Sequence, residues 1–357
     1  MRIAQFGLSA LLIVTISVFS HGPARAQDSG SFHLEFDLAG SYQLSNGDEN
    51  DTAPHSGAFR ARDFRLDMKG SINDRLYYRF RQNLRKPFAA GSLDSFAKGT
   101  DMAFVGYSPC SQFAVEAGKI CQHWGGFDYD EVPLYIYQYS DYMNHIDIFY
   151  AGVDFIWRPS EVHEFVFELS DPTNDLIPAR YPLSTLLNWN ARFGDGRVLT
   201  RCAFGGMTLG NGKYAKLLNG GIKFNYPHFQ WYADFMLEKD GADRVGIATF
   251  DLGANALSGK GEIWYNSKIL KAFWQFAPGW NLVVKGCWDD VAFDSGGRYR
   301  SSLLGLCSLE YYPVESQDLR FFICGTAHHI MFNGPSLPSP FTTARAEIGL
   351  IYKLRIL

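Results

Sequence analysis

Apolar and polar side chains alternate along most of this chain. Residues 187–193 place Leu, Trp, Ala and Phe at the odd positions and Asn, Asn and Arg at the even positions. Residues 229–238 and 345–355 repeat this alternation. Because the side chains of a β-strand point alternately to its two faces, a period of two predicts strands with one apolar face and one polar face.

Sixteen segments of this kind can be marked between clusters of turn residues. We place them at residues 31–44, 57–71, 75–86, 101–108, 112–120, 147–158, 162–170, 186–194, 197–209, 213–226, 229–238, 262–276, 280–289, 299–312, 318–331 and 342–355.

The links between these segments alternate between tight and long. Tight, turn-like links include Asn73–Asp74, Asp195–Gly196 and Pro227–His228, whereas the links between them are mostly long. An even strand number with this asymmetry predicts an all-β fold, a transmembrane antiparallel up-and-down β-barrel of about 16 strands, with both termini on the tight-turn side. The least regular stretch is 239–262, which can form an external hairpin or hold a miscounted strand.

The first 26 residues have the layout of a secretory signal peptide. Arg2 precedes an apolar run from Phe6 to Phe19, and Ala24-Arg25-Ala26 forms a cleavage site of the A-x-A kind. The apolar run is shorter than the ~20 residues that a membrane-spanning helix needs. We therefore expect a cleaved leader at 1–26, a single barrel domain at 27–357, and a place in the outer membrane of a Gram-negative bacterium.

Charge and motifs exclude several classes of protein. The leader holds two of the 33 basic residues and no acid, which leaves 31 basic against 37 acidic residues and a net charge of −6. That balance argues against a nucleic-acid partner. No nucleotide-binding loop, H-E-x-x-H or G-x-S-x-G motif occurs, so we expect no cofactor and no enzyme activity. No C-x-x-C occurs, so we expect no metal site.

The six cysteines leave disulfide pairing open. Most of them lie singly within predicted strands rather than in paired loop positions, which favours free thiols.

One predicted strand carries an unusual density of positive charge. On the strand 75–86 and the polar face of the strand before it lie six basic residues, which we call the arginine face: Arg65, Lys69, Arg75, Arg79, Arg81 and Arg85. An unpaired arginine facing lipid at mid-membrane costs ~2–4 kcal/mol, so these side chains must face the lumen. Two interpretations are open: a track that guides anions, or a wall in which Asp63 and Asp67 neutralise the arginines.

Two stretches resemble a known family. FRARDFRLDMKGSINDRLYYRFRQNLRK (59–86) and MAFVGYSPCSQFAVEAGKICQHWGGFDYDEVPLYIYQYSDYM (102–143) are similar to the phosphate-selective porin O and P family, especially its Bacteroidetes-type members. The resemblance implies a sixteen-stranded trimeric porin in which the third external loop folds inward as a constriction and lumen arginines guide anions.

The third long connection, Cys121 to Ile146, matches that loop in order and size. Its Trp124, Gly125 and Gly126 can supply a bend, and Asp128, Asp130 and Glu131 can place acids opposite the arginine face. The alternative is an aromatic-rich surface loop.

The function that these patterns favour is an outer-membrane porin for passive diffusion of small hydrophilic solutes, with a possible preference for anions or phosphate. Its expected partners are outer-membrane lipid, the solutes, and two further copies in a homotrimer. Two alternatives remain at this point. One is a soluble exported all-β binding protein, for example one that binds carbohydrate, and the other is a barrel enzyme with an active site on its rim.

Overall fold

A computed structural model describes residues 30–46, 56–86, 96–172, 181–253, 255–314, 316–334 and 337–356. Its helical elements are α1 (Phe127–Asp130), α2 (Asp141–Asn144), α3 (Ile247–Leu252) and the 3-10 turns η1 (Pro133–Tyr135) and η2 (Gly210–Gly212). Its strands are β1 (Ser31–Ser45), β2 (Ser56–Ser71), β3 (Leu76–Asn83), β4 (Thr100–Cys110), β5 (Phe113–Cys121), β6 (Phe149–Trp157), β7 (His163–Ser170), β8 (Ser184–Phe193), β9 (Val198–Thr208), β10 (Tyr214–Tyr226), β11 (Phe229–Asp240), β12 (Ile263–Ala277), β13 (Trp280–Phe293), β14 (Gly297–Tyr311), β15 (Asp318–Phe332) and β16 (Phe341–Arg355).

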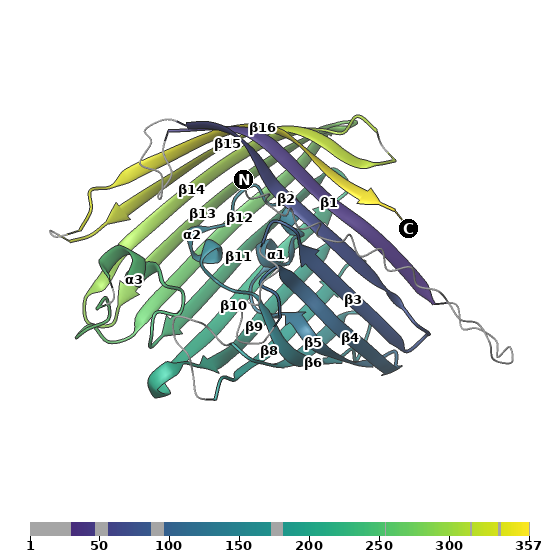
Figure 1. Cartoon of the computed structure of the whole chain (residues 1–357), viewed down its shortest axis with the longest axis horizontal. Coiled ribbons are helices and arrows are strands. Elements are labelled where there is room, and N and C mark those ends of the chain that lie inside the picture. Colours follow the sequence, from purple (N-terminus) through teal and green to yellow (C-terminus); the bar gives the residue numbers. More distant parts are fainter. Residues whose placement is uncertain are drawn as a thin grey trace, which may run out of the picture.

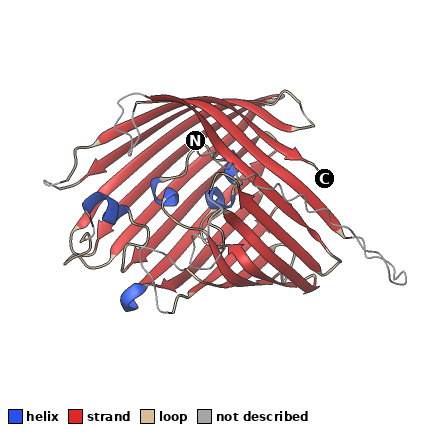
Figure 2. Cartoon of the chain, in the orientation of Figure 1, coloured by secondary structure: helices blue, strands red, loops and turns tan. Residues whose placement is uncertain are grey.

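The strands form one closed antiparallel barrel (Figures 1 and 2). Each strand pairs with its neighbours in the chain, and β1 closes the ring against β16, with Ala39 opposite Ile351. Closure leaves no strand edge with unpaired N–H and C=O groups, which is the condition for placing a sheet in a bilayer. The prediction of a sixteen-stranded up-and-down barrel is confirmed over the described residues.

Every predicted strand segment overlaps one observed strand. The described residues of 239–262, which leave out 254, hold the end of β11 and the short helix α3, with neither a hairpin nor a further strand. The predicted leader, 1–26, lies outside the described residues. Within the described ranges, no helix combines the length and the apolar run required to cross a bilayer.

The two faces of the barrel differ as the alternation predicts. On β11, Asp234 and Glu238 are buried toward the interior, whereas Phe229 and Phe235 are exposed on the outside. Aromatic side chains gather near the tight turns on the outer surface, where Trp280 contacts Phe276 and Tyr311 at ring-centroid distances of 6.5 and 4.7 Å. Such a girdle marks the boundary between hydrocarbon and water.

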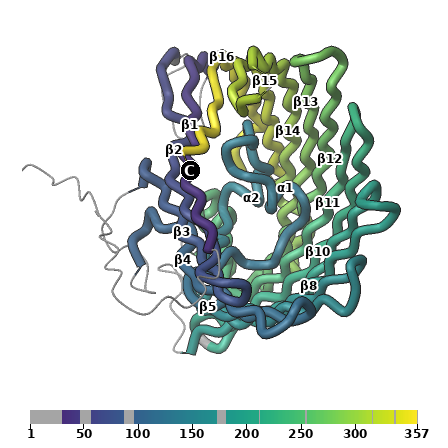
Figure 3. Tube along the Cα trace, turned by 90° about the vertical axis from the view of Figure 1, so that its right-hand side faces the viewer, coloured from purple at the N-terminus to yellow at the C-terminus, as the bar shows by residue number. Residues whose placement is uncertain are grey.

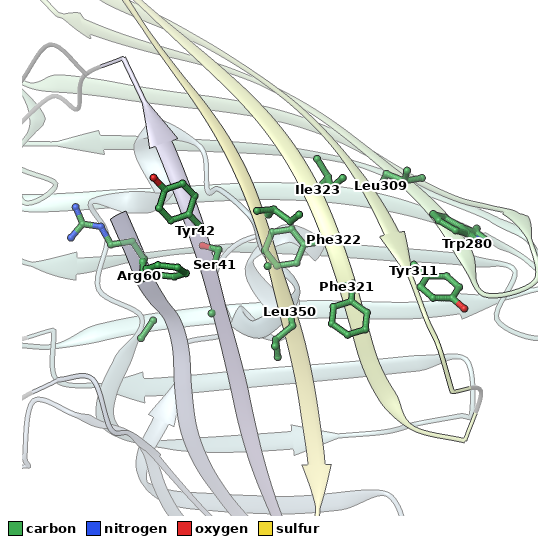
Figure 4. A pocket seen from close by; sticks show the side chains of 15 residues that line it. Ser41, Tyr42, Arg60, Trp280, Leu309, Tyr311, Phe321, Phe322, Ile323 and Leu350 are labelled. Atoms are coloured by element: carbon green, nitrogen blue, oxygen red, sulfur yellow. The ribbon is translucent and has the colours of Figure 1, made fainter. Parts of the chain in front are cut away.

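The outer surface also has an apolar hollow of about 850 Å³ over β14, β15, β16, β1 and β2 (Figure 4). Its lining includes Tyr42, Leu309, Phe321, Ile323 and Leu350, all exposed on the outside of the ring. An apolar hollow on the lipid-facing side does not bind hydrophilic solutes. The solute path must therefore be sought inside the ring.

The six cysteines are all free thiols in the structure. Three of them, Cys110, Cys202 and Cys307, are exposed, and Cys287 and Cys324 are buried. Strand pairing alone therefore closes the barrel, without disulfide bonds.

Candidate functional site: the lumen and its inner segment

The connection between β5 and β6, residues 122–148, lies within the ring of strands and carries α1, η1 and α2 (Figures 1 and 3). We call these residues the inner segment. Its elements contact opposite parts of the wall: α1 lies against β10 and β11, η1 against β1 and β2, and α2 against β12.

A bend near its start turns the inner segment toward β10 and β11. Gly125 has a φ of +105°, a conformation that favours glycine, and a Cβ there would meet the ring of Tyr129. A side chain at Gly126 would collide with the carboxylate of Asp234. Trp124 is 2% exposed and stacks near Tyr142, with ring centroids 6.0 Å apart. The Trp-Gly-Gly stretch therefore fixes the point at which the chain approaches the wall.

Three acids near the start of the inner segment form ion pairs with the β9–β13 wall. Asp128 pairs with Lys285 of β13 at 2.7 Å, Asp130 with Arg201 of β9, and Glu131 with Lys271 of β12. The hydroxyl of Tyr232 and the carboxylate of Asp234, both on β11, bind Asp128 as well, the latter by accepting from its backbone N–H. These pairings place the three acids on the β9–β13 side of the ring, across the lumen from the arginine face on β2 and β3, and each acid has a basic partner on its own side.

The second half of the inner segment is held through its backbone carbonyls and aromatic hydroxyls. Arg62 of β2 donates to the carbonyls of Ile136 and Tyr137, each at 3.0 Å. The hydroxyl of Tyr137 donates to Glu310 of β14 at 2.6 Å. The guanidinium of Arg300 pairs with Asp141 at 2.8 Å.

Sequence reasoning missed these anchors, and only one of them left a local signal. Arg62 breaks the alternation of its strand because it sits at a β-bulge, where the register with β1 shifts. Glu310, which binds the hydroxyl of Tyr137, and Arg300, which binds the carboxylate of Asp141, are more than 150 residues away in sequence from these partners. No local pattern identifies contacts of that separation.

The arginine face is a salt-bridged wall where it lies on β2 and β3. Arg65 bonds to Asp63 and, at 2.7 Å, to Asp101, and Arg81 lies 3.3 Å from the same Asp101. Arg79 pairs with Asp67 at 2.7 Å and Lys69 with Glu35 at 3.1 Å.

The four arginines 75, 79, 81 and 85 do not form a file along one strand. Strand β3 covers only Leu76–Asn83, so Arg75 and Arg85 lie beyond its ends and are exposed. The side chain of Arg85 donates instead to the backbone carbonyl of Arg62. Of these four arginines, only Arg79 and Arg81 lie on β3, each next to a carboxylate, and Arg81 is 5% exposed.

His123 carries a positive charge at the base of the inner segment. Burial alone would lower the pKa of its ring, but Asp154, 3.3 Å away, raises that pKa to about 9. The backbone N–H of His123 also donates to Glu168 at 2.7 Å. At neutral pH the imidazolium therefore pairs with Asp154 of β6, while the backbone N–H ties the same residue to Glu168 of β7.

Lys285 is the most constrained anchor, since it binds both Asp128 and the carbonyl of Gln138 at 2.8 Å. Both charged side chains are almost fully buried, at 2% and 0% exposure. Breaking a buried pair costs about 3–5 kcal/mol, so Lys285→Met is expected to loosen the inner segment. Single-channel recordings should show increased current noise. Adding Asp128→Asn removes the buried carboxylate charge that has lost its partner, and it should reduce the noise. Current noise in Lys285→Met equal to that of the parent would contradict this anchoring role.

Comparison with known proteins agrees with this architecture. The sequence profile of the family described as phosphate-selective porin O and P matches residues 32–229. No curated protein sequence matches the chain.

Solved structures share the fold at low sequence identity. An anion-selective porin from Comamonas acidovorans superposes with a TM-score of 0.64 at 10% identity, covering 91% of this chain and 100% of that chain. The outer membrane channel DcaP of Acinetobacter baumannii gives 0.66 at 9% identity, covering 93% and 99%. The trimer form of OmpT, an outer membrane protein of Vibrio cholerae, gives 0.61 at 11% identity, covering 92% and 100%.

The profile match covers more than half of the chain, and the closed barrel with an apolar outside and a charged inside is the architecture that this family requires. Porins are water-filled channels through which small solutes cross the outer membrane by passive diffusion. The barrel is an outer-membrane porin, and the chain belongs to the phosphate-selective porin O and P family.

Proposed function

We propose that the inner segment is the constriction of this porin and sets the size of solute that passes. The observation that carries the proposal is its anchoring: side chains of β2, β9, β11, β12, β13 and β14 all bind residues 128–142. A segment fixed to so many strands occupies the lumen permanently rather than opening and closing as a lid. Small hydrophilic solutes then pass beside it.

Charge selectivity in this channel is modest. Lys69 and Arg79 keep side-chain exposures of 39% and 30% although both are ion-paired, so they present positive charge to the water of the lumen. Their acidic partners reduce the field that a passing anion feels. We therefore assign a weak anion preference, with phosphate among the solutes, instead of a phosphate-specific path.

Three further parts of the proposal rest on the family and its neighbours. The channel works as a homotrimer, as the trimer form of OmpT does. The leader at 1–26 is cleaved on export. The protein acts as a channel rather than as an enzyme, as the porin family does.

Localisation and folding test the proposal together. We expect the protein in the outer-membrane fraction, running faster on a gel when unheated than when boiled, because a closed barrel resists detergent until heated. Purified protein should form stable open channels in planar bilayers. Recovery as a soluble periplasmic monomer would instead support the exported binding protein.

A further inference from the structure

A polar chamber of about 290 Å³ lies inside the barrel, between the inner segment and the tight turns. Glu131 and Tyr135 of the inner segment line it on one side. Its wall is the run of strands from β10 to β15. It is bounded by Lys223 on β10, three residues before the end of that strand, and by Asp318, the first residue of β15. At about 30 Å³ per water molecule, the chamber holds roughly ten waters that a solute can displace.

The charges of this chamber balance, and two of its ion pairs are internal. Lys271 pairs with Glu131, and Arg320 pairs with Glu310 at 3.0 Å. Arg320 is further fixed over the ring of Tyr135, with its guanidinium carbon 4.2 Å from the centroid. These four side chains neutralise one another and form the frame of the chamber.

Two charges of opposite sign remain at its two ends. Lys223 is half-buried, and no carboxylate of the described residues lies within ion-pairing distance of it. Asp318 accepts a hydrogen bond from the hydroxyl of Tyr135 but, within the same described ranges, forms no ion pair. A cation and an acid without charged partners, in a chamber that is otherwise neutral, favour a solute that carries both charges.

Two residues of the inner segment, Glu131 and Tyr135, line the chamber. Glu131, with its partner Lys271, marks the β10–β12 end, and Tyr135, with its partner Asp318, marks the β15 end. Four residues of chain span at most about 14 Å. That is an upper limit for the Cα separation of Glu131 and Tyr135, and an extended tripeptide of about 10 Å fits a chamber of this scale. Gln230 and Tyr312 add side-chain groups that can bind peptide N–H and C=O groups between the ends.

We propose that this chamber is a binding site for short zwitterionic peptides of about three residues, with Lys223 receiving the terminal carboxylate and Asp318 the terminal ammonium group. The proposal rests on the porin function and names the class of solute that pauses behind the constriction. A phosphate or other simple anion does not satisfy it, because such a solute leaves Asp318 unpaired.

Block of single-channel current by triglycine, added on the tight-turn side, tests the site. Lys223→Gln and Asp318→Asn are each expected to raise the half-blocking concentration about tenfold, which corresponds to the loss of one charge-assisted contact worth roughly 1.4 kcal/mol. The matched control is Lys216→Gln, since Lys216 lies on the same strand but is exposed outside the chamber. Triglycine should block this control variant at the same half-blocking concentration as the parent.

Modified peptides assign each end. Triglycine amide lacks the carboxylate and should block more weakly, with the same half-blocking concentration in Lys223→Gln as in the parent. Acetyl-triglycine lacks the ammonium group, and its half-blocking concentration should be the same in Asp318→Asn as in the parent. Exchanging the charges, with Lys223→Asp and Asp318→Lys together, should restore block by triglycine. Block by inorganic phosphate as strong as block by triglycine, or a half-blocking concentration unchanged in both single variants, would overturn the proposal. Absence of any open-channel current in the parent would instead refute the porin function itself.

Discussion

Deleting Phe127–Tyr139 is expected to raise the single-channel conductance about twofold or more and to admit larger sugars, because the deletion removes the segment that narrows the lumen. The strands keep all their ladder hydrogen bonds, so the barrel itself should remain closed. Conductance in KCl and liposome swelling with sugars of increasing size measure the effect. A channel of unchanged conductance would show that the inner segment does not limit flow.

The same deletion is expected to shift selectivity toward anions. Residues 127–139 contain Asp128, Asp130 and Glu131 and no basic residue, so the lumen loses three negative charges. Arg201, Lys271 and Lys285 lose their partners at the same time. The variant with Asp128→Asn, Asp130→Asn and Glu131→Gln is the matched control. It should shift selectivity in the same direction, and because it keeps the backbone of the inner segment, its conductance and size limit should rise less than those of the deletion variant.

The strands could be predicted from sequence because alternation is a local property of each segment. The turn between β8 and β9 also has a local cause, because Asp195 adopts a positive φ of 55° beside Gly194 and Gly196. Strand ends were less predictable. Strand β3 stops at Asn83 because its side chain accepts from the backbone N–H of Arg85, which turns the chain out of the ladder.

The arrangement of the lumen could be predicted only in part. The sequence places the arginines on the inner face, and Asp67 was available as a partner for Arg79 on the adjacent strand. Strand alternation does not identify Asp101 as a partner of the arginines, because it lies at a β-bulge. The bulge brings its carboxylate between Arg65 and Arg81. The partners of the inner segment depend on which strands face each other across the closed barrel, and alternation carries no information about that.

The ion pair between Arg79 and Asp67 is expected to set much of the ion selectivity. Neutralising each residue in turn separates the effects of the two charges. Asp67→Asn keeps the size of the side chain and leaves Arg79, whose side chain is 30% exposed, without its counter-charge. A unit charge about 7 Å from a passing ion changes its energy in water by about 0.6 kcal/mol, a factor of about 3 in local concentration.

The reversal potential in a KCl gradient should therefore move toward chloride in Asp67→Asn and toward potassium in Arg79→Gln, and the double variant should return close to the parent. Asp290→Asn is the matched control. Asp290 lies on the opposite face of β13 from the buried Asp289 and pairs with Lys268, 3.7 Å away, whose side chain is 52% exposed. The control removes one acid from the outside of the barrel and should leave the reversal potential unchanged. If Asp67→Asn and Asp290→Asn behave alike, the paired arginines lie outside the ion path, and the charges that select ions must be sought among the basic residues that hold the inner segment.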